Sequence, residues 1–73
     1  MMKKKIRIGI EEHFIKEFLI EAEGKDMDEI IENAIEIAEQ KYSDGKLKIR
    51  HGKPDFKLMA VTQKGKETEW TEF

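Results

Sequence analysis

The chain has 73 residues, of which 38% are hydrophobic and 41% charged, and it contains no cysteine. This length allows one domain, residues 1–73, with a single thin core, and it excludes a second domain or a three-layer enzyme. The absence of cysteine excludes disulfides and suits a reducing cytoplasm, and no apolar stretch is long enough for a secretion signal or a membrane span.

Charge changes sign from one segment to the next, although the net charge is only −2. Residues 1–10 carry four bases and no acid, residues 11–45 carry twelve acids and three bases, and residues 46–66 carry seven bases and one acid. Three glutamates in residues 67–73 complete the balance. The helix and the strands predicted below therefore differ in the charge that they expose.

The first predicted strand covers residues 3–10. Its isoleucines alternate with lysine, arginine or glycine, which is the period-two pattern of a half-buried strand. Residues 11–13 read as a short connection to the next strand.

The second predicted strand covers residues 14–23. Its even positions, which include Phe14 and Phe18, are expected on the core because three odd positions carry glutamate. This phase leaves Ile15 and Leu19 on the outer face of the sheet.

A helix is predicted to begin after Asp26 and to end at Ser43-Asp44-Gly45. Asp26 and Glu29 approximate a capping box, and Gly45 can adopt the left-handed conformation that ends a helix. The apolar residues recur at helical spacing and form one stripe: Met27, Ile30, Ile31, Ala34, Ile35, Ala38 and Tyr42, widened by Ile37.

Two or three further strands are predicted after the helix. Residues 46–50 alternate bases with Leu47 and Ile49, and residues 56–63 are apolar on both faces. Lys64-Gly65-Lys66 is a turn signal, and residues 67–73 form either a last strand or a loose tail.

The order β-β-α-β-β, with a possible last strand, predicts an α+β fold of two layers. A single helix packs on one face of a small, mostly antiparallel sheet, and the strand of residues 3–10 lies between those of residues 14–23 and 46–50. The other sheet face would then be open to solvent and locally basic. Its bases are Lys5, Arg7, Lys46, Lys48 and Arg50.

The residues give no sign of catalysis. Ser43, the one serine, lies in the turn that ends the helix, and His13 and His51 each stand beside a turn without a third group to orient them. No ligand spacing resembles a metal site, and no glycine-rich phosphate loop is present. We therefore expect a protein that is not an enzyme and uses no cofactor.

Two surfaces could bind another protein. The helix carries a ridge of acids at spacings of three or four, which is either a solvated face or a docking surface for a basic partner: Glu29, Glu32, Glu36 and Glu39. Ile15, Leu19 and Trp70 exceed what one helix can bury, so they face another chain unless the C-terminal segment covers them. For that segment we predict a hairpin over residues 64–73 that buries Trp70 against Met59 or on the Ile15–Leu19 side.

The basic sheet face offers an alternative, because bases on an open sheet can contact nucleic-acid phosphates. The candidates for such contacts are Lys5, Arg7, Lys46, Lys48 and Arg50. Single-strand binders add exposed aromatic side chains for stacking, and here Trp70 is the sole candidate outside the predicted core strands.

From Ile6 to Ile49 the pattern resembles the small DpnD/PcfM-like domain. The similar pieces are Ile6-Arg7-Ile8-Gly9-Ile10-Glu11-Glu12, Phe18-Leu19-Ile20-Glu21-Ala22-Glu23, Asp28-Glu29-Ile30-Ile31-Glu32 and Lys41-Tyr42-Ser43-Asp44-Gly45-Lys46-Leu47. The resemblance covers rather more than half of the chain, and it implies a protein of phages, conjugative plasmids or restriction loci. It carries over no functional residue.

The leading hypothesis is a cytoplasmic accessory protein, encoded by a phage or another mobile element, that binds another protein such as a component of host defence or transfer. A nucleic-acid-binding module is the alternative, and a structural homodimer is a third possibility.

Overall fold

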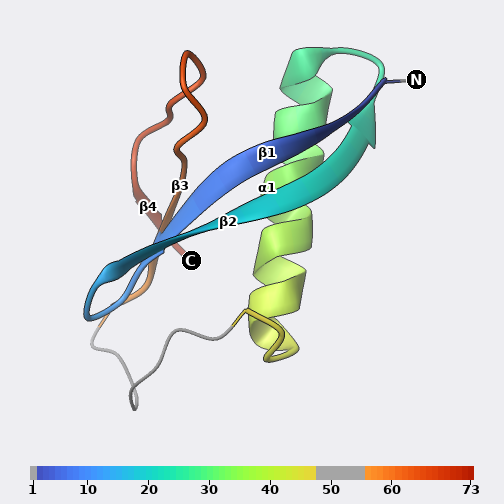
Figure 1. Ribbon diagram of the computed structural model, residues 1–73. Coiled ribbons are helices and arrows are strands. Elements are labelled where there is room, and N and C mark those ends of the chain that lie inside the picture. Colours follow the sequence, from blue (N-terminus) through green and yellow to red (C-terminus); the bar gives the residue numbers. More distant parts are fainter. Residues whose placement is uncertain (1, 48–55) are drawn as a thin grey trace.

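The computed structural model describes residues 2–47 and 56–73, which form one helix and a four-stranded sheet (Figure 1). The elements are β1 (Met2–Glu11), β2 (Ile15–Gly24), α1 (Met27–Ser43), β3 (Leu58–Val61) and β4 (Thr71–Glu72). The strand order is β2-β1-β3-β4, and every neighbouring pair is antiparallel. The predicted α+β class with a single helix on one sheet face is confirmed.

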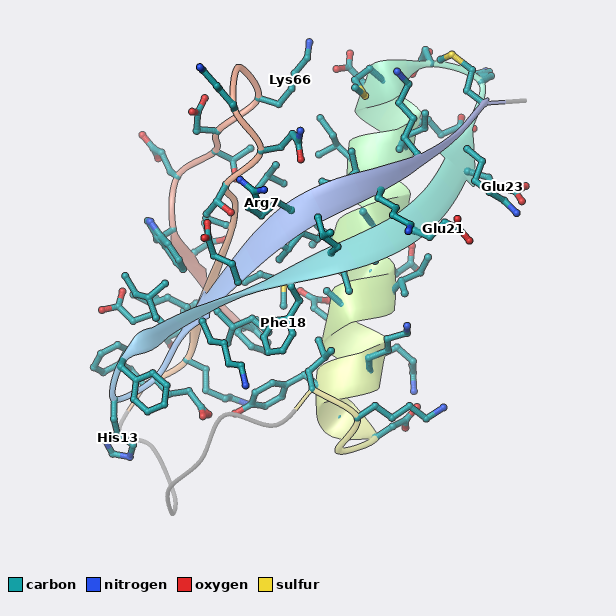
Figure 2. All side chains as sticks on the ribbon, viewed as in Figure 1. Arg7, His13, Phe18, Glu21, Glu23 and Lys66 are labelled. Carbon is teal, nitrogen blue, oxygen red and sulfur yellow. The ribbon has the colours of Figure 1, made fainter. Side chains whose placement is uncertain are left out.

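β1 and β2 form a long hairpin that is the largest part of the sheet. Ten residue pairs connect the strands, from Met2 opposite Gly24 to Glu11 opposite Ile15. His13 lies at the turn and Glu23 at the other end of β2 (Figure 2). Phe14 was expected on the core, but it lies in the turn before β2, outside the alternation of the strand, and is 42% exposed.

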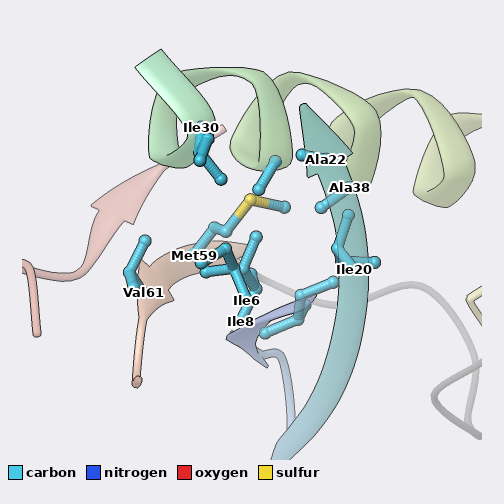
Figure 3. Close-up of a cluster of buried hydrophobic side chains, with 10 residues drawn as sticks. Ile6, Ile8, Ile20, Ala22, Ile30, Ala38, Met59 and Val61 are labelled. Atoms are coloured by element: carbon cyan, nitrogen blue, oxygen red, sulfur yellow. The ribbon is translucent and has the colours of Figure 1, made fainter. Parts of the chain in front are cut away.

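The core lies between the inner face of the hairpin and α1 (Figure 3). Alternate residues of β1 and β2 enter it from the sheet, and one stripe of the helix enters it from the other layer. The buried apolar side chains of this core, two of them from β3, are Ile6, Ile8, Ile10, Ile20, Ala22, Ile30, Ala34, Ala38, Met59 and Val61. Ile6, Ile8 and Ile10 were placed correctly by their alternation.

The helix begins and ends where its capping residues predict. Asp26 is the N-cap, and its carboxylate accepts a hydrogen bond from the backbone N–H of Glu29 at 2.9 Å. The Glu29 side chain accepts in turn from the N–H of Lys25 at 3.2 Å, which completes a variant of the capping box. Gly45 has a φ of 76°, so it takes the left-handed conformation expected after the helix.

The strand beside β1 is β3, and not the segment of residues 46–50 that the alternation pattern suggested. Lys46 and Leu47 lie outside any strand, and residues 48–50 lie outside the described residues. β3 suits the position beside β1 because it is apolar on both faces. Met59 faces the helix side with Ile10, and Ala60 opposes Gly9 on the outer side, where it is also buried.

The C-terminal segment folds back on β3, as the turn signal predicted. Gly65 has a φ of 83° in the turn, and β4 pairs with β3 through Met59 opposite Thr71. Between turn and strand, the Thr68 hydroxyl accepts a hydrogen bond from the Val61 N–H at 2.8 Å. Only two residues form the regular strand, fewer than the seven residues that could have formed it.

Candidate protein-binding surface

Two large apolar side chains stand in solvent on the outer face of β2. Ile15 is 54% exposed and Leu19 is 59% exposed, as their odd phase predicts. Glu17 and Glu21, both exposed, share this face with them. The outer face of β2 therefore alternates aliphatic and acidic side chains.

Trp70 is also on the outer face, but it packs against the sheet and is half-buried. A Cβ atom built on Gly9 would lie 2.7 Å from the Trp70 ring, so the ring rests directly on the glycine backbone. Of the two contacts predicted for Trp70, Met59 and the Ile15–Leu19 side, the ring takes the second: it lies on the outer face over Gly9 of β1, half-buried where the prediction had it largely buried. Glycine permits this approach because it has no side chain.

The acids of the helix do not form one surface with these residues. Glu29 caps the helix start and is half-buried, whereas Glu32, Glu36 and Glu39 are exposed. These three lie on the helix, in the layer opposite the outer sheet face. Of these, Glu36 reaches the boundary between the layers.

That boundary is an open groove of about 600 Å³ between the second half of β2 and the helix. Asn33, Glu36, Ile37 and Gln40 line one side, and their i, i+3, i+4, i+7 spacing puts them on one helix face. Lys3, Glu21, Ala22 and Glu23 line the other side. In the described part of the chain, the groove thus combines the apolar Ala22 and Ile37 with three glutamates and one lysine.

The hydrogen bonds of Arg7 show which backbone groups of β2 face the open edge of the sheet at this groove. Its carbonyl accepts from the Thr62 N–H at 2.9 Å, and its N–H donates to Gln63 Oε1 at 3.1 Å. Both polar groups of the Arg7 backbone therefore point away from β2. Successive residues of a strand point their backbone groups to opposite sides. The N–H and C=O groups of Ile6 and Ile8 therefore point toward β2.

The pairing of β1 with β2 then fixes the direction of each residue in β2. Ile20 is opposite Ile6 and Phe18 is opposite Ile8, so these two residues turn their backbone groups toward β1. The residues between and beside them turn their N–H and C=O groups outward, to the open edge: Glu17, Leu19 and Glu21. No described residue pairs with them there.

Asn33 supports this assignment. Its side-chain amide donates to the carbonyl of Glu23 at 2.7 Å, so that carbonyl also points away from β1. The helix thereby satisfies the last outward carbonyl of β2.

Charge along the hairpin is arranged in opposite pairs. Lys3 lies opposite Glu23 and Lys5 opposite Glu21. The ammonium of Lys3 approaches the carboxylates of Glu23 at 3.6 Å and of Glu21 at 4.0 Å, with all three side chains exposed. Exposed pairs of this kind contribute little stability, about 0–1 kcal/mol. They show that Glu21 and Glu23 of β2 have positively charged side chains on the neighbouring strand.

Of the candidate bases for nucleic-acid contact that the structure describes, two lie on the outer face and one does not. Lys5 and Arg7 lie there opposite Glu21 and Leu19, whereas Lys46 follows the helix end, and its N–H bonds to the Lys41 carbonyl. Lys48 and Arg50 lie outside the described residues. The uniformly basic face expected from residues 46–50 is therefore wrong for Lys46, because that residue is not in the sheet.

A buried polar contact escaped the sequence analysis. Glu12 was assigned to a loop, yet it is 5% exposed and accepts a hydrogen bond from the Tyr42 hydroxyl at 2.5 Å. The Tyr42 ring meets Phe73 edge-on at 5.2 Å, and the Lys57 ammonium lies 5.3 Å from the Tyr42 ring. This contact joins the hairpin turn, the helix end and the C-terminus.

The pKa of the tyrosine in this contact is raised. Burial raises the pKa of Tyr42 to about 12, and the hydrogen bond to Glu12 and the charge of that carboxylate act in the same direction. The sequence held no signal for the pair, since the two residues are 30 positions apart.

Among residues 2–47 and 56–73, no group of three or more histidines or acids is placed to hold a metal ion. In the same part of the chain, no helix has the length and apolar character needed to cross a membrane. Comparisons with protein-family models, with curated proteins and with solved structures gave no match. The resemblance to the DpnD/PcfM-like domain stays a prediction.

Proposed function

We propose that the protein is a small, non-enzymatic interaction module that binds another protein. The observation that carries this proposal is the exposure of Ile15 and Leu19 on one strand of a domain with few large apolar side chains to spare. Exposed aliphatic side chains that share one face are typical of contact sites for other proteins. The acidic residues around them favour a partner with basic groups.

An accessory role in the cytoplasm, in a phage or another mobile element, is part of the same proposal. It rests on the resemblance to the DpnD/PcfM-like domain, and a component of host defence or transfer would then be the partner. Nucleic acid is a weaker alternative, because Lys5 and Arg7 share the outer face with Glu17, Glu21 and Leu19.

The proposal is tested by affinity capture from cells of the source organism with three immobilised proteins. These are the wild type, the double variant Ile15→Ser/Leu19→Ser and the control Met2→Ser, which removes an exposed apolar side chain at the far end of the hairpin. We expect a protein that is retained by the wild type and the control and lost from the double variant. Equal retention by all three, or retention of nucleic acid that nuclease treatment removes, would contradict the proposal.

A further inference from the structure

We propose that the open edge of β2 binds an extended basic segment of a partner protein as an additional strand of the sheet. This inference deepens the proposed function and rests on it. It names the part of the surface that is used and the chemistry of the partner.

The first argument is the unused hydrogen-bonding capacity of the edge. β2 has ten residues, whereas β4, at the other edge of the sheet, has two. Glu17, Leu19 and Glu21 turn their N–H and C=O groups outward with no described partner. A row of unpaired backbone groups is a template for strand addition, in which main-chain hydrogen bonds supply affinity and alternate side chains supply specificity.

The second argument is the charge of the strand. The side chains on the outer face at this edge are Glu17, Leu19 and Glu21, which favour a neighbour with bases at positions i and i+4. β1 provides one such base on the other side, since it sets Lys5 opposite Glu21, but it places Gly9 opposite Glu17. A partner strand with bases at i and i+4 would therefore add a base beside Glu21 and supply the one that Glu17 lacks.

The third argument is the groove. The inward-facing side chains of an added strand would point to the helix side, where Ala22 and Ile37 offer apolar contacts and Glu36 adds a third acid. The groove therefore prefers a strand with small aliphatic residues on its inner face and bases on its outer face. The hydrogen bond between Asn33 and Glu23 limits the added strand to the region before Glu23.

A second copy of the chain fits this edge poorly. If two β2 strands paired antiparallel about Leu19, Glu17 of each copy would lie opposite Glu21 of the other. Two pairs of like charges facing each other directly are destabilising. The charge that favours a basic strand thus opposes self-association.

The test is an NMR titration of the full ¹⁵N-labelled chain with the peptide acetyl-Thr-Lys-Val-Thr-Val-Lys-Thr-amide. We expect saturable shifts at the amides of Glu17, Leu19 and Glu21, with slower hydrogen exchange at these sites. Replacing both peptide lysines by glutamate, or N-methylating the central threonine, should weaken binding at least tenfold. Absence of saturable shifts at millimolar peptide, or shifts confined to other elements, would overturn the proposal.

Protein variants separate the edge from general electrostatics. Leu19→Pro removes an outward N–H and should abolish peptide binding while the chain stays folded. Glu21→Gln should weaken binding more than Glu69→Gln, which removes the same charge from an exposed site near the C-terminus. Equal effects of these two glutamine variants, or unchanged binding by Leu19→Pro, would refute strand addition.

Failure of this titration would leave the proposed function standing if the capture experiment retains a protein through Ile15 and Leu19. If the peptide binds but no protein is captured through Ile15 and Leu19, the open edge of β2 is supported and the proposed function is wrong. The two outcomes are therefore distinguishable.

Discussion

At the scale of single residues, Glu12 and Tyr42 connect the hairpin turn to the helix end, and Phe73 at the C-terminus packs on the Tyr42 ring. Glu12 is almost fully buried, and its carboxylate accepts a hydrogen bond from the Tyr42 hydroxyl. A buried polar group left without its hydrogen-bond partner costs about 1–3 kcal/mol, and a charged carboxylate costs more. The contact thus fixes the hairpin turn against the helix end more firmly than an exposed turn would allow.

The raised pKa of Tyr42 gives a direct measurement of this contact. The chain has one tyrosine, so absorbance at 295 nm should report its ionisation with a midpoint near pH 12, and near pH 10 in urea. Because the folded pKa lies above the unfolded value of 10.0, the contribution to stability is complete below pH 10 and is lost as the pH rises toward 12. A midpoint near 10 in the folded chain, checked by circular dichroism, would contradict the contact.

Gly9 and Trp70 form the second residue-scale contact. A methyl group on Gly9 would lie 2.7 Å from the Trp70 ring and 3.0 Å from Thr62 Cγ2, so Gly9→Ala should displace the ring. We expect a red-shifted emission from the single tryptophan and a loss of about 1–3 kcal/mol in the free energy of unfolding. Lys64→Ala, at an exposed position of the turn, is the control that should leave the emission unchanged. A variant Gly9→Ala with wild-type emission would show that the ring does not rest on this glycine.

At the scale of elements, the open edge of β2 makes a prediction about proline. Leu19 turns its N–H outward, so Leu19→Pro removes no hydrogen bond to β1 and should change the free energy of unfolding by about 1 kcal/mol or less. Ala22, opposite Lys4, turns its N–H toward β1, so Ala22→Pro should cost about 3 kcal/mol or more. Urea denaturation of the two variants compares them directly, and equal stability losses would mean that the edge assignment is wrong.

The elements also show which sequence patterns were sufficient to predict the structure. The helix was predictable from Asp26, Glu29 and the apolar stripe, because capping and periodicity are local properties. The strand beside β1 was not, because residues 46–50 and residues 56–63 both read as strands. Residues 56–63 are apolar on both faces, and this is the property that suits the place next to β1, where Ala60 and Met59 are buried on opposite faces.

The candidate site shows the same limit. Alternation placed Ile15 and Leu19 on the outer face correctly, since it depends on one strand. The groove could not be predicted, because it brings Glu21 and Glu23 of one layer to Asn33 and Glu36 of the other. The edge position of β2 follows from the predicted order, which put residues 3–10 between it and the next strand, but the residues that turn their backbone groups to the open side depend on the register with β1.

At the scale of the whole molecule, the segregated charges become a mixed sheet and an acidic boundary. The basic β1 lies beside the acidic β2, so Lys3 is paired with Glu21 and Glu23 within the hairpin and Lys5 lies opposite Glu21. The open side of β2 and the exposed face of α1 keep their acids. This distribution favours basic partners and opposes pairing between copies of the chain.

The charge on β2 predicts the oligomeric state and how to change it. The wild type should sediment as a monomer at about 100 μM, because antiparallel pairing of two β2 edges about Leu19 would oppose Glu17 to Glu21 twice. Glu17→Lys would turn both like-charge pairs into opposite-charge pairs, each of which contributes roughly 0.2–1 kcal/mol in a sheet. We expect this variant to associate at least tenfold more tightly, with the gain lost when Glu21→Lys is added. If the wild type associates and Glu17→Lys weakens that association, another surface joins the copies. A red shift of the Trp70 emission on dilution would identify that surface as the C-terminal segment.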